Sequence, residues 1–155
     1  MIKVIRVDHR LVHGQIIYSW LGSSDINTIF VVNDDVVKND ARKNALRMVK
    51  PPSIKMVMMS VKDSIEAINS GVTDKYNMMI ICENISDAYS LITNTSGITS
   101  LNLGGTLAKE DTKQYYSQIN LSENDISKLN DLVDKGIEVE IRMVPKDKKQ
   151  IYKKK

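Results

Sequence analysis

Short apolar segments alternate with amphipathic stretches along most of this chain, and that alternation constrains the fold more than any other feature. The apolar segments are predicted to be strands: Ile2–Val7, Thr28–Val32, Ile54–Met59, Asn77–Cys82, Ser100–Leu103 and Ile137–Met143. The earlier segments are apolar on both faces, which is typical of parallel strands covered by helices on both sides. The sequence therefore predicts an α/β fold built on an open, mostly parallel, doubly wound sheet.

Apolar residues at helical spacing fill the intervals between these segments. Four stripes follow this spacing: Val37, Ala41, Ala45 and Met48; Val61, Ile65 and Ile68; Ala88, Leu91 and Ile92; Ile126, Leu129 and Val133. Three helix starts place a small polar residue three positions before a carboxylate: Ser60 and Asp63, Asn84 and Asp87, Ser122 and Asp125. This spacing lets the polar side chain cap the helix while the acid lies in its first turn. Gly136 follows the last stripe, where a left-handed C-cap is expected.

The carboxyl-terminal third of the chain is less regular. In Ile137–Met143, apolar residues alternate with charged ones such as Glu138 and Glu140. That alternation predicts an edge or half-exposed strand. The segment Thr106–Asn120 is the hardest to assign, and a short strand around Tyr115–Ile119 is one interpretation.

Positive charge is concentrated at the carboxyl-terminal end. Residues 146–155 contain six lysines and one aspartate, which leaves 16 basic and 18 acidic residues in the rest of the chain. We expect a single domain over residues 1–147 and a basic tail over residues 148–155. Such a tail can bind acidic lipid or a partner, but a frayed, solvated terminus is the simpler interpretation. A nucleic-acid-binding protein would spread Lys and Arg over a folded face with interleaved aromatic residues, so no nucleic acid is expected as a partner.

Hydropathy and cysteine content favour a cytoplasmic location. No apolar run approaches the roughly 18 residues needed to span a bilayer. Charges interrupt the amino-terminal apolar stretch, which makes it a poor signal peptide. The single cysteine, Cys82, ends an apolar run and is expected to be a buried, inert thiol in a reducing compartment.

Polar residues of chemical interest gather in residues 6–15, which read Arg-Val-Asp-His-Arg-Leu-Val-His-Gly-Gln. This segment links the first predicted strand to an amphipathic helix containing Trp20, so it forms a loop at the carboxyl end of a strand. Open α/β sheets bind their ligands at that edge. His13 lies at or just before the helix start, where free N–H groups and the helix dipole attract an anion. Gly14 lets the backbone approach a ligand closely.

Arg10 and Asp8 are residue types that would support a phosphorylated histidine. Arg10 offers a planar, permanently charged fork to phosphate oxygens. Asp8 is placed to orient an imidazole nitrogen or to hold Arg10. A nucleophilic imidazole must be neutral, and positive charge from Arg10 and the helix start is expected to lower the pKa of His13. The same groups would stabilise a phosphoryl group during transfer.

Other interpretations stay open on chemistry alone. A lone loop histidine is often only a solvent-facing side chain. His9 and His13 are four residues apart beside Asp8, a spacing found in metal sites. Only a helix would align them, however, and no further ligands gather nearby, so no metal is expected.

Asp34, Asp35 and Asp40 form a second acidic group after the second predicted strand. They are expected to cap the following helix and line its start, although Asp34 can also face the ligand site. A receiver-type domain phosphorylated at Asp34 and Asp35 is a weaker hypothesis, because the lysine and hydroxyl residues that such domains need are not evident.

Residues 6–15, followed by Trp20, resemble the active-site signature of enzyme IIB subunits of the mannose/fructose/sorbose family of the bacterial sugar phosphotransferase system. That pattern runs Arg-hydrophobic-Asp-X-Arg-Leu-hydrophobic-His-Gly-Gln, with a Trp a few residues on. Three further stretches are similar to family landmarks: residues 32–36 with Asp40, residues 102–105 and residues 144–147. The resemblance covers nearly the whole chain and implies a mostly parallel sheet of about seven strands with helices on both faces.

The resemblance also implies roles for the loop residues. His13 would be the phosphorylated histidine, with Arg10 and Asp8 lining the phosphate pocket and Gly14 and Gln15 completing the loop. His9 stands where aspartate is frequent in the family, and would tune the phosphate or substrate pocket.

A phosphocarrier of this kind has several partners. The donor would be a phosphorylated IIA domain, and the acceptor a sugar of the mannose, fructose, sorbose and N-acetylgalactosamine class, held by membrane subunits IIC and IID. No cofactor is needed, and the protein would be cytoplasmic and peripherally associated with the transporter. A homo-oligomer is an open option. The competing hypothesis is a non-catalytic anion- or nucleotide-binding module that uses the same loop.

Overall fold

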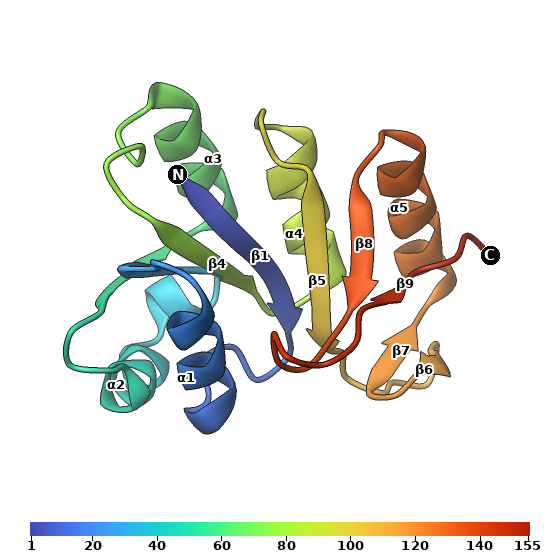
Figure 1. Ribbon diagram of the computed structural model, residues 1–155, viewed down its shortest axis with the longest axis horizontal. Helices are drawn as coiled ribbons and strands as arrows, with labels where there is room; N and C mark the ends of the chain where they lie inside the picture. Colours follow the sequence, from blue (N-terminus) through green and yellow to red (C-terminus); the bar gives the residue numbers. More distant parts are fainter.

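Seven strands form one sheet in the computed structural model, which describes residues 1–155 (Figure 1). They are Ile2–Asp8 (β1), Thr28–Val32 (β2), Lys55–Met59 (β3), Met78–Cys82 (β4), Ser100–Gly105 (β5), Glu138–Ile141 (β8) and Gln150–Ile151 (β9). Their spatial order is β3-β2-β4-β1-β5-β8-β9. Neighbouring strands of this sheet pair in parallel, except that β8 and β9 are antiparallel. The open, mostly parallel α/β sheet predicted from the sequence is therefore confirmed, with β1 at its centre.

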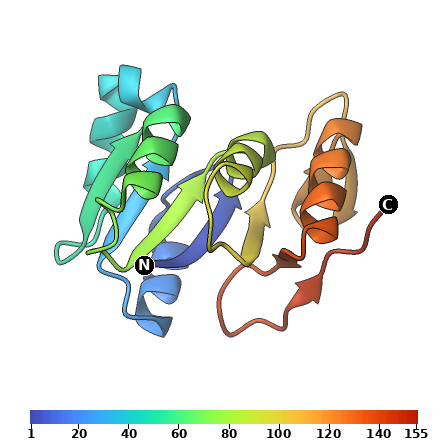
Figure 2. The ribbon, with the colours of Figure 1, turned by 90° about the horizontal axis from the view of Figure 1, so that it is seen from above.

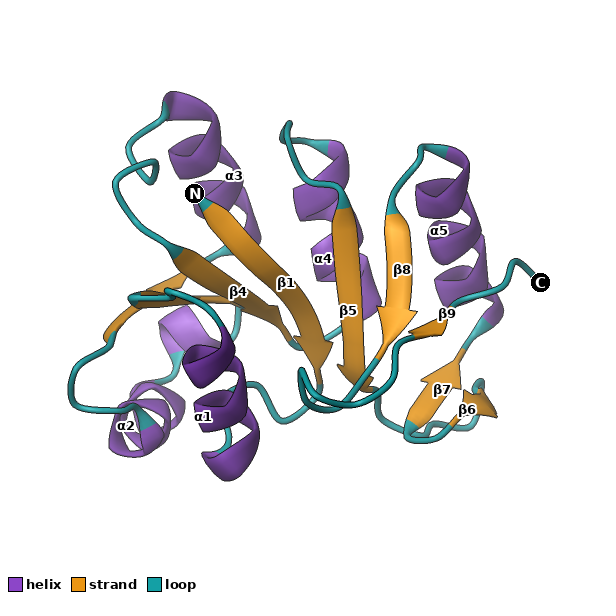
Figure 3. Ribbon diagram, viewed as in Figure 1, coloured by secondary structure: helices purple, strands orange, loops and turns teal.

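Five α-helices and one short 3-10 helix connect the strands (Figure 3). They are Gly14–Ser23 (α1), Val36–Lys38 (η1), Asp40–Val49 (α2), Val61–Ser70 (α3), Ile85–Thr93 (α4) and Glu123–Asp134 (α5). Seen from above, α1 lies on the opposite side of the sheet from α4 and α5 (Figure 2). The helix after β1 and the helix after its neighbour β5 thus cover opposite faces. This arrangement opens a crevice at the carboxyl ends of the two strands, where ligands of such sheets bind.

Two buried apolar clusters hold the layers together. One joins Ile29 and Val31 of β2 to Ile17 and Trp20 of α1. The other, on the opposite face of the sheet, includes side chains of α4 and α5. Each parallel strand of the middle of the sheet is therefore buried on both faces, as its continuous apolar sequence indicated.

The predicted helix caps are confirmed at three helices. Ser60, Asn84 and Ser122 each accept a hydrogen bond from the backbone N–H three residues on. Gly136 has the left-handed conformation expected after α5, with φ of 85°. These caps satisfy N–H groups at helix starts that have no partner within the helix.

The acidic group after β2 differs from the prediction. Asn39 caps α2, while Asp40 occupies its first turn. Asp34 accepts a hydrogen bond from the backbone N–H of Val61 at the start of α3. Asp35 pairs with Arg42 at 2.8 Å. The expectation that these aspartates cap α2 was therefore wrong, because Asn39 does so, whereas the expectation that they line the start of the helix is confirmed for Asp40.

The carboxyl-terminal part is more ordered than the sequence suggested. Residues 106–121 contain an antiparallel hairpin of Lys113–Tyr116 (β6) and Ile119–Leu121 (β7), where one short strand was expected. The prediction that β8 is an edge strand was wrong, because β8 pairs with β5 on one side and with β9 on the other. The prediction that residues 148–155 form a frayed tail was also wrong. Tyr152 is buried and its hydroxyl donates to Asn130 of α5 at 2.8 Å, and Lys154 pairs with Asp134.

The helices of this fold are too short or too polar to span a membrane.

Candidate active site

The loop after β1 brings the predicted site residues to the carboxyl edge of the sheet. Asp8 is the last residue of β1, and His13 is the N-cap of α1, as predicted. The His13 side chain makes no capping hydrogen bond, so its ring is available for other contacts. Gly14 begins the helix with φ of 30° and has open space around its Cα. Its glycine identity therefore serves a left-handed backbone conformation.

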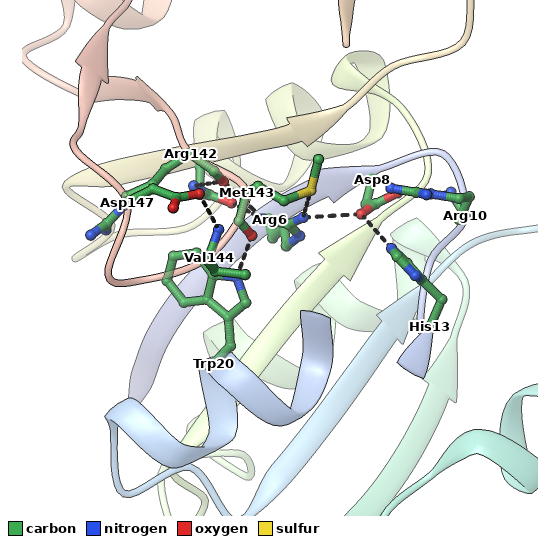
Figure 4. Close-up of polar contacts among 10 residues, drawn as sticks. Arg6, Asp8, Arg10, His13, Trp20, Arg142, Met143, Val144 and Asp147 are labelled. Atoms are coloured by element: carbon green, nitrogen blue, oxygen red, sulfur yellow. Dashed lines mark hydrogen bonds and ion pairs between the residues drawn. The ribbon is translucent and has the colours of Figure 1, made fainter. Parts of the chain in front are cut away.

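Asp8 is the hub of the loop (Figure 4). Its carboxylate is 0% exposed and faces three positively charged or titratable groups. Its Oδ2 atom accepts a hydrogen bond from Arg6 at 3.1 Å and lies 3.5 Å from Nε2 of His13. Its Oδ1 atom accepts from the backbone N–H of Arg10 at 3.0 Å. One buried carboxylate therefore fixes both the loop backbone and the side of the imidazole that it faces.

The imidazole of His13 is presented with one nitrogen inward. Nε2 is buried and lies at ion-pair distance from Asp8, beyond the usual length of a hydrogen bond, while 30% of the side chain is exposed. Burial lowers the pKa of His13. The negative charge of Asp8 raises that pKa, and the positive charges of Arg10 and Arg6 lower it. The predicted direction is confirmed, although burial is the largest cause. The neutral form of the ring is therefore favoured at neutral pH.

Arg10 and Gln15 lie at the open side of this loop. The Arg10 side chain is 42% exposed, with its Nε atom 3.5 Å from Asp8. The guanidinium is thus tethered at one end and accessible to a ligand. Gln15 lies in the first turn of α1 and is exposed. Both are placed to meet an anion that approaches the start of the helix.

His9 and Asp34 have surroundings different from those of His13. The backbone N–H of His9 donates to Gly105, and its ring lines a polar cavity of about 520 Å³ at the carboxyl ends of β4 and β5. His13 does not line that cavity. Asp34 accepts a hydrogen bond from the backbone N–H of Val61 at the start of α3. No group of three or more His, Cys, Asp or Glu side chains is arranged to hold a metal ion.

Sequence reasoning missed a buried polar network behind Asp8. Arg6 donates from Nη1 to Asn102 of β5 at 2.7 Å and to the backbone carbonyl of Arg142 at 3.1 Å. The Arg142 guanidinium in turn donates to both carboxylate oxygens of Glu140 at 2.9 Å. This pairing buries Glu140 in β8, where the sequence pattern had predicted exposure.

Trp20 joins α1 to the same network. Its indole N–H donates to the backbone carbonyl of Met143 at 3.0 Å. The guanidinium groups of Arg6 and Arg142 lie 5.7 and 5.2 Å from its ring centroid. An arginine near the end of the first strand, flanked by the apolar residues Ile5 and Val7, was the one sequence signal that could have revealed this network.

Comparison with known proteins extends over almost the whole chain. Residues 2–154 match the family model of the PTS system sorbose subfamily IIB component. The fructose-specific EIIB component of Bacillus subtilis (strain 168) is 32% identical over 94% of this chain and 90% of its own length. The mannose-specific EIIAB component of Escherichia coli (strain K12) is 31% identical over 96% of this chain, which spans 46% of that longer protein. The crystal structure of the IIBSor domain of the sorbose permease from Klebsiella pneumoniae has a TM-score of 0.91 at 25% identity, covering 97% of this chain and 92% of that one.

The chain belongs to the sorbose subfamily of IIB components of the sugar phosphotransferase system. It is accordingly a phosphotransferase that acts in sugar uptake.

Proposed function

We propose that this IIB component carries its phosphoryl group on Nδ1 of His13. The observation behind this assignment is the position of Nε2. This atom is buried, and it lies 3.5 Å from the carboxylate of Asp8. A proton on Nε2 that points at Asp8 leaves the lone pair of the ring on Nδ1. The carboxylate therefore selects the tautomer in which Nδ1 is the nucleophile.

The reaction then consists of two displacements at phosphorus. In the first, the lone pair of Nδ1 attacks the phosphorus of a phosphohistidine on the donor, and the broken P–N bond returns its electrons to the donor imidazole. In the second, a sugar hydroxyl oxygen attacks, the P–Nδ1 bond returns its electrons to His13, and the hydroxyl proton is lost to water. The protein contributes mainly positioning and charge stabilisation to such transfers.

The surrounding residues have distinct proposed tasks. Arg10 neutralises charge on the phosphoryl oxygens, since its guanidinium is accessible beside the imidazole. The backbone N–H groups of Gly14 and Gln15 are in the first turn of α1, where N–H groups have no partner within the helix. His9 and Asp34 are given no direct task in this proposal, because the His9 ring lines the neighbouring cavity and Asp34 accepts a hydrogen bond at the start of α3.

The proposed donor is a phosphorylated IIA domain, and the proposed acceptor is a sugar presented by the membrane subunits IIC and IID. The chain would then act in the cytoplasm against the membrane transporter. The name of the Escherichia coli relative, EIIAB, supports the pairing with IIA. Relatives named for fructose, mannose, sorbose and N-acetylgalactosamine support a sugar of that class.

The intact mass of the protein after incubation with a phosphorylated IIA domain tests this proposal. We expect the mass to increase by one phosphoryl group, and the added mass to be lost in acid, where phosphohistidine hydrolyses. A non-catalytic module that binds anions through the same loop would show reversible phosphate binding and an unchanged mass. A base-labile adduct would instead indicate an aspartyl phosphate.

A further inference from the structure

Arg6 is a fully buried arginine in the central strand, and the transfer reaction as described gives it no task. Its side chain is 1% exposed, and that of its partner Asp8 is 0% exposed. Removing both charges from water costs free energy that a pair of apolar residues would avoid. A buried ion pair is therefore a poor way to gain stability, and its place next to His13 points to a task in the reaction.

The Arg6 guanidinium is held from several elements. Nη2 donates to Oδ2 of Asp8 at 3.1 Å, the same oxygen that faces His13. Nη1 donates to Oδ1 of Asn102 in β5 and to the carbonyl of Arg142, which follows β8. The guanidinium thus ties the Asp8 carboxylate on one side to the Asn102 side chain and to the backbone just after β8 on the other.

The Arg6 guanidinium packs closely against Gly104 of β5. A Cβ atom at Gly104 of β5 would overlap Cζ, Nη1 and Nη2 of Arg6, so only glycine leaves room for the guanidinium. Trp20 of α1 covers it from another direction. A side chain fixed by so many neighbours can fix its own partner in turn.

We propose that Arg6 is a positioning residue for phosphoryl transfer, which holds the Asp8 carboxylate so that Oδ2 faces Nε2 of His13. The proposal rests on the function assigned to His13 above. Arg6 has no contact with the imidazole and acts through Asp8. Asn102 and the backbone at Arg142 act one step further back, because they hold the other end of the guanidinium.

The proposal predicts the effect of Arg6 on the titration of His13. The charged groups that face the imidazole are Asp8, Arg10 and Arg6, with the pair of Glu140 and Arg142 behind Arg6. In the intact protein the pKa of His13 is lowered, so the rate of phosphorylation is expected to fall only as the pH drops below the usual pKa of histidine. Without Arg6, the negative charge of Asp8 acts on the ring with less opposition. The pKa of His13 then rises, fewer rings are neutral at pH 7, and the pH profile of the rate moves upward.

Two arginine-to-lysine variants form a matched pair for the test. Arg6 contacts Asp8, whereas Arg47 lies exposed on α2, where its Nη1 donates to Asn44 of the same helix. The Arg6→Lys variant keeps the positive charge but has a single nitrogen in place of the two guanidinium nitrogens that bind Asp8 and Asn102. We therefore expect phosphorylation by a phosphorylated IIA domain to be about 100-fold slower. The Arg47→Lys variant should remain close to the wild-type rate, because the same substitution there leaves every contact of Asp8 in place.

A third variant, Arg6→Met, tests the charge. The pKa of His13, measured from the titration of its ring protons by NMR, is expected to rise in Arg6→Met and to return toward the wild-type value in Arg6→Lys. Thermal unfolding and amide spectra establish that each variant is folded. If a variant at position 6 does not fold, Asn102→Ala replaces it, since it leaves both charges in place and removes one anchor of the fork; about tenfold slower phosphorylation is then expected.

The outcomes separate this proposal from the function on which it rests. Folded Arg6→Lys or Asn102→Ala protein with a wild-type rate would overturn the positioning role, and so would Arg6→Met protein in which the pKa of His13 is unchanged or lower. A wild-type protein that takes no phosphoryl group on His13 would instead overturn the proposed function. The NMR titration reports on Arg6 in either case.

Discussion

Replacing His13 with alanine is expected to abolish covalent phosphorylation by a phosphorylated IIA domain, whereas replacing His9 with alanine is expected to preserve it. The two imidazoles are four residues apart in one loop, but their surroundings differ. Only the ring of His13 faces the buried carboxylate of Asp8, next to the accessible guanidinium of Arg10. Loss of the nucleophile leaves no atom in that place that can form the P–N bond.

The pair of variants is matched, because each removes one imidazole from the same loop. The measurement is the intact mass of each variant during a time course with the phosphorylated donor. His13→Ala should stay at its starting mass throughout, and His9→Ala should gain one phosphoryl group at a rate similar to that of the wild type. Labelling of His13→Ala, or its loss in a folded His9→Ala protein, would show that the roles of the two histidines are misassigned.

Replacing Gly104 with alanine is expected to lower the free energy of unfolding by about 3–5 kcal/mol, the range for breaking a buried ion pair. The added methyl group would occupy the position of the Arg6 guanidinium, which is fully buried and held by hydrogen bonds to Asp8, Asn102 and the carbonyl of Arg142. Arg6 must then leave Asp8, and the carboxylate remains buried without its charge partner. Chemical denaturation monitored by the fluorescence of Trp20 measures the change.

Gly22→Ala is the control for this prediction. Gly22 lies near the end of α1, and a Cβ atom there would meet no atom within 4 Å. Alanine favours the helix over glycine by roughly 0.5–1 kcal/mol, so this variant should match or exceed the wild type in stability. A Gly104→Ala protein as stable as Gly22→Ala would mean that Arg6 can move without cost, and the positioning role would lose its basis.

The sequence predicted those features that depend on local pattern. Strand assignments followed from continuous apolar runs such as Met78–Cys82, and caps such as Ser122 followed from the spacing of a small polar residue and an acid. His13 was placed correctly because a strand followed by a helix puts the intervening loop at the ligand edge of the sheet. Each of these inferences needs only residues that are close together in the chain.

The features that were missed depend on residues far apart in the chain. The partners of Arg6 lie at positions 102 and 142, and no local pattern identifies them. Glu140 was expected to be exposed because alternation in a strand predicts one solvent face, but Arg142 pairs with it and permits burial. The lysine-rich tail was expected to fray, yet Tyr152 within it finds a buried site against α5 that composition alone does not reveal.

The most direct test of the central claim is an NMR spectrum of the phosphorylated wild-type protein with ¹⁵N-labelled histidine. Coupling to phosphorus identifies the ring nitrogen that carries the phosphoryl group, and the spectrum of His9→Ala assigns the two rings. We predict a single phosphorus-coupled nitrogen, Nδ1 of His13, because Nε2 of that ring is turned toward Asp8. Coupling at Nε2 of His13, at either nitrogen of His9, or at no ring nitrogen in a protein whose mass has increased would contradict the account.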